Sequence, residues 1–198
     1  MAVTKLTMSG FTASTFNKYD DFLAGNSAYI PSSFESIATA TPTSGSTVTF
    51  SSIPSTYKHL QLRMNIMGVA GSNIYYRLNG NSSTTSYTWH VLEGDGTSAS
   101  ATAGTTDGFS LLNFNTSKPS TTAPFVSVLD ILDYASTTKN KTGRSITGSN
   151  INTTSAAYGV TLGSGLWINT SAITSITITG SGVFATGTSI ALYGIKGS

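Results

Sequence analysis

The sequence contains no cysteine and little charge. Without a thiol, the chain has no thiolate nucleophile, disulfide, zinc finger or iron–sulfur ligand set. Charged residues make up only 9% of the chain, and ten scattered Lys and Arg against eight Asp and Glu give a net charge of +2. Because nucleic acid and anionic lipid are bound through clustered basic residues, we expect neither as a partner. No stretch approaches the roughly 20 apolar residues that a membrane-spanning helix needs, so we expect no membrane partner.

Hydroxyl and aromatic residues are abundant instead. Ser and Thr together make up roughly a third of the chain. Nine Tyr, nine Phe and two Trp, with regularly spaced Val, Ile and Leu, supply the side chains of a core and distinguish the chain from disordered Ser-rich sequences. A chain of 198 residues buries about 70% of its unfolded surface on folding. We therefore expect one domain that is stable without a disulfide or a metal.

Residues 1–33 differ in composition from the rest. They show no strand pattern, and large apolar side chains stand among small polar ones, at Phe11, Phe16, Tyr19, Phe22, Leu23, Tyr29 and Ile30. These are too many apolar groups for a merely solvated tail, so we interpret the segment as an extended N-terminal arm that anchors the protein on a partner or on other subunits. A flexible leader with a short helix near 15–24 is the alternative.

Residues 34–198 show the pattern of an all-β protein. Short runs rich in β-branched and aromatic residues alternate with Gly, Ser, Thr, Asn and Pro. The clearest run is 57–67, in which Leu60, Leu62 and Met64 point to one face while polar residues point to the other. The remaining predicted strands are 34–40, 46–51, 73–79, 86–92, 108–114, 124–134, 156–162, 165–169, 172–179 and 188–196. The series predicts a single antiparallel β-sandwich domain, jelly-roll-like in topology, with Greek-key variants as the alternative.

Candidate catalytic groups are few. Of the two histidines, His59 and His90 fall on different predicted strands, and nothing pairs them with a nucleophile. Asp130 and Asp133 are three residues apart in one strand, which places them on opposite faces and argues against a shared acid–base site. We therefore assign no catalytic residue.

The loop 93–97 is the one candidate for a bound ion. Glu93 and Asp95, with nearby carbonyl groups, have the oxygen ligands that Ca²⁺ prefers. The loop lacks the alternating Asp/Asn ladder and terminal Glu of an EF-hand, so we favour a plain turn. No phosphate-binding glycine motif occurs either. We expect no metal and no cofactor.

Four aromatic residues are candidates for a glycan-binding platform. Tyr75 and Tyr76 are adjacent, and Trp89 and Trp167 each have a neighbour that faces the opposite side of a strand. One residue of each pair should therefore lie in the core, while the other is free to stack against a sugar ring. The alternative is that the outer aromatics are covered by the arm or by a neighbouring subunit.

Several motifs together resemble one known family. They are FESIAT at 34–39, FSSIPSTYKHLQLR at 50–63, YTWH at 87–90 and SIALYGIKG at 189–197. In this order they resemble virion structural proteins of tailed bacteriophages, β-rich appendage or decoration modules of the tail-fibre-like family seen in phages of aquatic bacteria. The segments IPSTYKHLQLR and ALYGIKG are the most specific, and the loops between the motifs carry no resemblance. The resemblance implies a structural role in a virion, made in the cytoplasm of the bacterial host, and it brings no catalytic residues with it.

Size and surface composition narrow this expectation. A fibre needs a coiled coil or a repeated shaft, and one globular head with a short arm leaves no residues for either. The predicted strands present mainly Ser and Thr to solvent, which suits close packing against copies of the same chain. We expect a non-enzymatic capsid decoration, or cement, protein, a homotrimer that docks on the major capsid protein through its arm.

The main alternative is a tail, baseplate or fibre-tip component that contacts a tail protein and binds host polysaccharide. A free carbohydrate-active enzyme is disfavoured, because no convincing carboxylate pair is present. Loss of glycan hydrolysis on replacing Asp95 or Asp107 would be its signature.

Overall fold

The computed structural model describes residues 33–68, 74–110, 121–149 and 159–197. The sandwich belongs to a unit that spans Phe34–Ser198. Apart from Ser33, the predicted arm lies outside the described residues, and with it the anchor candidates Phe11, Phe16, Tyr19, Phe22, Leu23 and Tyr29. Predicted strand residues 73, 111–114 and 156–158 lie outside them as well.

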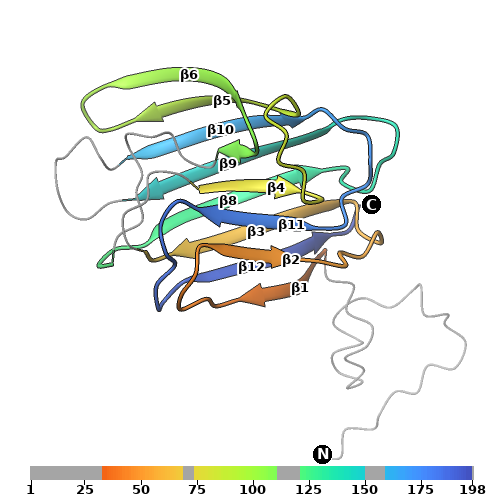
Figure 1. The fold of residues 1–198 in the computed structure, drawn as a ribbon, viewed down its shortest axis with the longest axis horizontal. Coiled ribbons are helices and arrows are strands. Elements are labelled where there is room, and N and C mark those ends of the chain that lie inside the picture. Colours follow the sequence, from red (N-terminus) through yellow and green to blue (C-terminus); the bar gives the residue numbers. More distant parts are fainter. Residues whose placement is uncertain (1–32, 69–73, 111–120, 150–158, 198) are drawn as a thin grey trace, which may run out of the picture. The chain divides into compact units, whose positions relative to one another are not determined.

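The described residues form two antiparallel sheets and contain no helix (Figure 1). The strands are β1 (Phe34–Ala40), β2 (Thr47–Phe50), β3 (His59–Ile66), β4 (Ile74–Leu78), β5 (Tyr87–Gly94), β6 (Ala99–Thr106), β7 (Phe109–Ser110), β8 (Phe125–Leu132), β9 (Lys141–Ser149), β10 (Val160–Trp167), β11 (Ile176–Gly180) and β12 (Ser189–Ile195). One sheet has the order β1-β12-β3-β8-β9-β10-β5-β6, and the other β2-β11-β4-β7. The predicted all-β sandwich is confirmed.

Alternation along the strands decides which side chains enter the core. In β3, Leu60, Leu62, Met64 and Ile66 are at most 4% exposed, and the residues between them face away from the four-stranded sheet. The eight-stranded sheet, called the long sheet below, therefore has an inner face against the four-stranded sheet and an outer face on the opposite side. Strands β5 and β6 extend past the edge of the four-stranded sheet (Figure 1).

Aromatic rings of the four-stranded sheet pack over glycines of the long sheet. The rings of Tyr76 and Phe109 stack at 4.4 Å between centroids, and Tyr87 meets Phe109 edge to face at 5.0 Å. A Cβ atom at Gly165 would overlap the Phe109 ring, and one at Gly143 would overlap the Tyr76 hydroxyl. The two sheets approach this closely because β9 and β10 carry glycine at these inward positions.

The glycines also explain where the predicted strand series was wrong. Strand β10 runs unbroken through Gly163 and Gly165, where the sequence predicted two strands, 156–162 and 165–169. Strand β9 was missed because its inward residues include Lys141, Gly143 and Ser145, which do not form an apolar period. Strand β6 was missed because its small residues are mostly exposed at the edge of the long sheet.

Within the described ranges the chain forms no helix that is long and apolar enough to cross a membrane.

Candidate functional site: an outer sheet face

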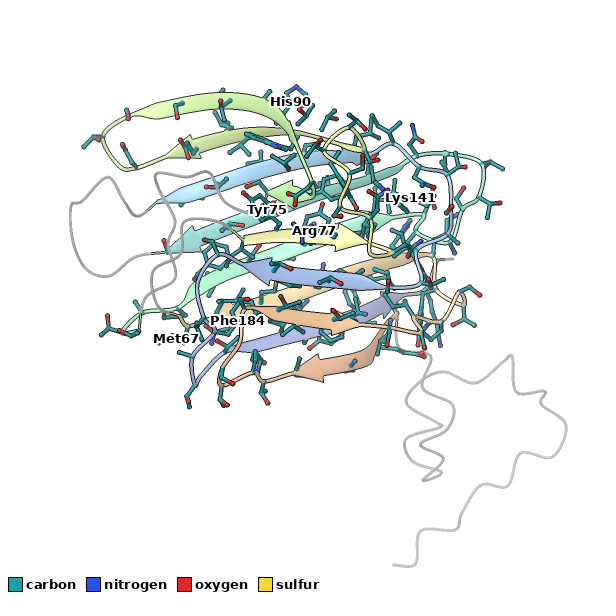
Figure 2. The ribbon with its side chains drawn as sticks, in the orientation of Figure 1. Met67, Tyr75, Arg77, His90, Lys141 and Phe184 are labelled. Atoms are coloured by element: carbon teal, nitrogen blue, oxygen red, sulfur yellow. The ribbon has the colours of Figure 1, made fainter. Side chains whose placement is uncertain are left out.

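The two histidines do not share a site. His59 begins β3, and its Nδ1 accepts a hydrogen bond from the backbone N–H of Asp133 at 3.0 Å. His90 lies exposed on the outer face of β5 (Figure 2). Three strands separate β3 from β5 in the long sheet, which puts these two strands about 19 Å apart at the usual strand spacing. A single catalytic centre cannot use both.

Asp133 organises the turn that follows β8. Lys58 Nζ lies 3.0 Å from its carboxylate, and Lys139 pairs with the other oxygen. Hydrogen bonds from Lys139 and Lys58 lower the pKa of Asp133 to about 2. Asp130, in contrast, lies on β8 and accepts a 2.8 Å hydrogen bond from Gln61 Nε2. The two carboxylates therefore have separate partners.

The loop 93–97 is a turn closed by its own carboxylate. Asp95 Oδ1 accepts hydrogen bonds from the backbone N–H groups of Thr97 and Ser98 at 2.8 and 2.7 Å, and from the Thr97 hydroxyl at 2.7 Å. These hydrogen bonds, led by that from the Ser98 backbone, hold the pKa of Asp95 well below its usual range. Glu93 is buried and accepts a hydrogen bond from the Ser100 hydroxyl at 2.9 Å. Both carboxylates thus accept hydrogen bonds from donors of the protein. Across the described ranges, no three or more His, Asp or Glu side chains lie close enough together to hold a metal ion.

Two further charged groups have structural partners. Arg77 on β4 donates from Nε to the carbonyl oxygen of Asp107 at 2.9 Å and pairs with its carboxylate (Figure 2). Lys141 is 1% exposed, and its ammonium donates to the carbonyl oxygens of Lys139 and Thr170 at 2.8 and 3.0 Å. Burial lowers the pKa of Lys141. Asp107 is therefore held by Arg77, and Lys141 fills two backbone acceptors.

Three of the four candidates for the glycan platform lie in the core. Tyr76, Trp89 and Trp167 are 2%, 8% and 1% exposed, because they point to the inner face of their sheets. Their neighbours point outward: Tyr75 is half-buried and His90 is exposed. The prediction that one residue of each pair lies in the core is confirmed, but the large ring is the buried one in the pairs that contain tryptophan.

The outer face of the long sheet carries a feature that the sequence analysis missed. Val128, Ile146, Leu162 and Leu92 lie directly opposite one another on the adjacent strands β8, β9, β10 and β5. These side chains are 40%, 63%, 50% and 53% exposed. They form a continuous line of large apolar groups across the sheet, which we call the apolar row.

Two parallel rows flank the apolar row. On one side Val126 and Val160, 49% and 61% exposed, alternate with Gly148 and Gly94 to form the valine–glycine row. On the other side a polar row crosses the same strands and consists of Gln61, Asp130, Arg144, Ser164 and His90. From β8 to β5 the outer face is thus apolar over two rows and polar over the third, whereas on β3 these two rows continue with the exposed polar residues Arg63 and Asn65.

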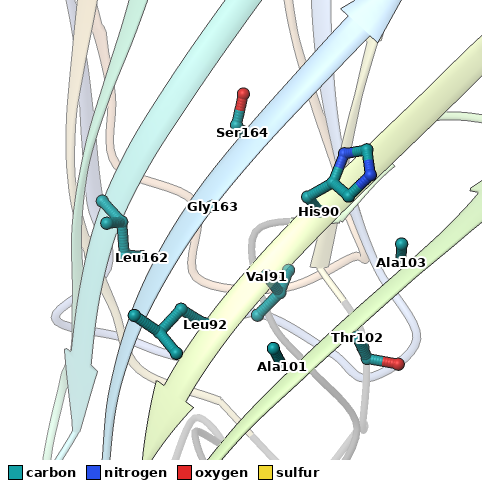
Figure 3. A pocket seen from close by; sticks show the side chains of 9 residues that line it. All are labelled: His90, Val91, Leu92, Ala101, Thr102, Ala103, Leu162, Gly163 and Ser164. Atoms are coloured by element: carbon teal, nitrogen blue, oxygen red, sulfur yellow. The ribbon is translucent and has the colours of Figure 1, made fainter.

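Two shallow hollows lie on this face. One, of about 500 Å³, is bounded by Leu162 and Leu92 on one side and by Ala101 and Ala103 of β6 on the other (Figure 3). The second, of about 640 Å³, extends from β12 across β3, β8 and β9 to β10 and includes Val126, Val128 and Ile146. Small residues beside large ones create both hollows, and their linings are mainly apolar.

The sequence did contain one signal of this face. Strand β8 reads FVSVLDIL, with apolar residues on both sides of the pleat. A strand that is apolar on both faces is typical of one covered on both sides. On its own, that run predicts only a strand, and β9, which supplies Ile146, was not predicted at all.

Comparisons of the chain with protein-family models, with curated proteins and with solved structures returned no match. The assignment of function therefore depends on the residues and the geometry described above.

Proposed function

We propose that the protein is a non-enzymatic structural subunit of a tailed-bacteriophage virion, a capsid decoration or cement protein that docks on the particle surface. The major capsid protein of the same virion is its partner, residues 1–33 supply the anchor, and copies of the chain associate with one another. The motif resemblance at 34–39, 50–63, 87–90 and 189–197 supports the virion assignment.

The observation that carries the proposal is the outer face of the long sheet, whose large apolar side chains the described residues leave exposed. Six large apolar side chains in the apolar and valine–glycine rows are 40% to 63% exposed. Together they present roughly 500 Å² of apolar surface, near the upper end of what soluble monomers expose in one patch, and such patches mark interaction sites. The candidate acid and base groups, by contrast, are separated or held by structural partners. This combination favours a protein that works by association.

The strand order supports a jelly-roll assignment within this proposal. A jelly roll places its first, eighth, third and sixth strands in one sheet and its second, seventh, fourth and fifth in the other. Without β5, β6, β9 and β10, the sheet orders β1-β12-β3-β8 and β2-β11-β4-β7 follow this arrangement. The four omitted strands then extend one sheet as insertions. Viral shell proteins commonly use the jelly roll, which is why the assignment favours a virion subunit.

The alternative, a tail component that binds host polysaccharide, has lost most of its structural support. Of the four aromatic candidates, only Tyr75 is partly exposed. The hollow bounded by Leu92 and Leu162 offers few polar groups to a sugar. A tail location without glycan binding remains the competing proposal.

A loading experiment tests the proposal. Particles that lack the protein are incubated with the purified full chain or with a chain that lacks residues 1–30, and bound protein is measured after sedimentation. The full chain should load onto the capsid, while the truncated chain should remain folded and fail to load. Equal loading of both chains would refute the anchor, and failure of the full chain to bind particles would refute the virion assignment.

A further inference from the structure

The outer face of the long sheet has a pattern that matches a second copy of itself. We propose that two copies pair through this face about a two-fold axis that runs parallel to the strands, between β9 and β10. This inference deepens the proposed function by naming the contact between subunits. The pattern rests on the register of β3, β8, β9, β10 and β5, in which each residue of a row lies directly opposite the next.

The apolar row is self-complementary under this rotation. A two-fold axis parallel to the strands exchanges β9 with β10 and β8 with β5, while each row stays at its own height. Ile146 therefore opposes Leu162 of the second copy, and Val128 opposes Leu92 of the second copy. All four side chains, which are 40% to 63% exposed in one copy, become buried between the two sheets.

The valine–glycine row is self-complementary in shape. The same rotation places Val160 against Gly148 of the second copy and Val126 against Gly94 of the second copy. Each branched side chain thus faces a position without one, so that two sheets about 10 Å apart can interdigitate along this row. A row in which valine faced valine and glycine faced glycine would leave gaps between the copies.

The polar row also tolerates this orientation. Asp130 opposes His90 of the second copy, and Arg144 opposes Ser164 of the second copy, so no two like charges meet. A two-fold axis perpendicular to the strands would instead place Asp130 against Val126 of the second copy, which buries a charge against an apolar group at a high free-energy cost. Exposed Arg63 on β3 opposes Ala101 of the second copy, at the rim of the face, under the parallel axis, but opposes Arg63 of the second copy under the perpendicular one. The arrangement of charges therefore favours the axis parallel to the strands.

The size of the face is sufficient for a stable pair. Six neighbouring strands of the long sheet form it, in the order β3, β8, β9, β10, β5 and β6. At about 4.8 Å between strands and about 3.4 Å per residue over eight residues, the footprint is roughly 800 Å². Each partner in a standard-size protein interface contributes about this area. The net charge of +2 adds little repulsion between copies.

This contact differs from the trimer that we expected from the sequence. A three-fold interface is heterologous, so it would place the outer face against a different surface of the neighbouring subunit. The two-fold arrangement uses the same residues on both copies and needs no second surface. The mass of the assembly in solution distinguishes the two.

The first test is the mass of the full chain by sedimentation equilibrium, with two matched variants. Leu162→Asp changes the centre of the apolar row, and Ile168→Asp changes a residue of the same 50% exposure in the loop after β10. We expect a dimer for the unchanged chain and for Ile168→Asp, and dissociation at least tenfold stronger for Leu162→Asp. A monomer or a trimer for the unchanged chain, or equal effects of the two variants, would overturn the inference.

A second test determines the position of the two-fold axis by crosslinking introduced cysteines, because the chain has no native ones. Chains with Val128→Cys and chains with Leu92→Cys are produced together and treated with a short bifunctional thiol crosslinker. Residue 128 of one copy opposes residue 92 of the other across the interface. Residue 128 of one copy and residue 128 of the other lie about 14 Å apart across the strands, which is three strand spacings, and the same holds for residue 92. We expect crosslinked pairs only when both chains are present. Equal crosslinking of either variant alone would contradict the axis.

The two proposals fail separately. If the chain pairs in solution but is absent from purified particles, the pairing stands and the virion assignment falls. If particles contain the chain but it sediments as a monomer, the virion assignment stands and the pairing falls.

Discussion

Replacing Gly165 by alanine tests the packing that holds the two sheets together. A methyl group at this position overlaps the Phe109 ring, which is 2% exposed and packed between Tyr76 and Tyr87. Inserting a methyl group into a well-packed core costs about 1–3 kcal/mol. The loss of glycine flexibility in the unfolded chain returns about 0.5–1 kcal/mol. We therefore expect a net loss of up to about 2.5 kcal/mol, or up to roughly 10 °C in Tm for a chain of this size.

Gly148→Ala is the matched control for this change. Its added Cβ meets only one atom within 4 Å, the carbonyl oxygen of Gly159 at 3.9 Å, so we expect no loss of stability and a gain of up to about 0.5 kcal/mol. Both changes are made in the Leu162→Asp chain, so that pairing of copies contributes nothing, and urea unfolding gives the free energies. A combined Gly165→Ala and Phe109→Leu chain should recover part of the loss. Equal stabilities of the two alanine variants would refute the packing argument.

Three further predictions follow from the buried and charged groups. The carboxyl of Asp133 has a pKa of about 2 in the folded protein against 3.8 ordinarily, so its contribution to stability is complete above about pH 4 and is lost as the pH falls toward 2. Asp133→Asn should therefore flatten this part of the acid unfolding profile. An unchanged profile would contradict the assignment of that pKa to Asp133. Lys141→Ala leaves two carbonyl oxygens without their donor and opens a cavity. We expect the free energy of unfolding in urea to fall by about 2–4 kcal/mol. A loss below about 0.5 kcal/mol, which is typical of surface substitutions, would contradict a structural role of Lys141. Because Trp89 and Trp167 are buried, host polysaccharide fragments should leave tryptophan emission and its quenching by iodide unchanged, and a saturable change would revive the glycan alternative.

The sequence predicted the strands whose two faces differ clearly in polarity. In β3 the alternation of Leu60, Leu62 and Met64 with polar residues specifies both the strand and its buried face, because successive side chains in a strand point to opposite sides. Strand β9 could not be found in this way, since its inward positions hold Gly143 and Ser145 instead of apolar side chains. Gly143 lies against the side chain of Tyr76, a residue far away in the sequence.

The candidate site was harder to predict than the fold. Alternation of apolar and polar residues shows that the two faces of a strand differ in polarity. It does not predict which face a second sheet will cover. Trp89 and His90 are adjacent, and only the packing of the two sheets shows that the tryptophan is inside. The apolar row joins Val128 to Leu92 through two other strands, so it depends on the strand order, which a single sequence did not reveal. The anchoring role of residues 1–33 stays a prediction.

The number of copies of the chain per purified virion tests the central claim most directly. Quantitative mass spectrometry against the major shell protein measures this number without any assumption about how the protein binds. A capsid decoration protein should be present at a number of the same order as the major shell protein. A number as small as that of the tail proteins would move it to the tail, and absence from the particle would contradict the account.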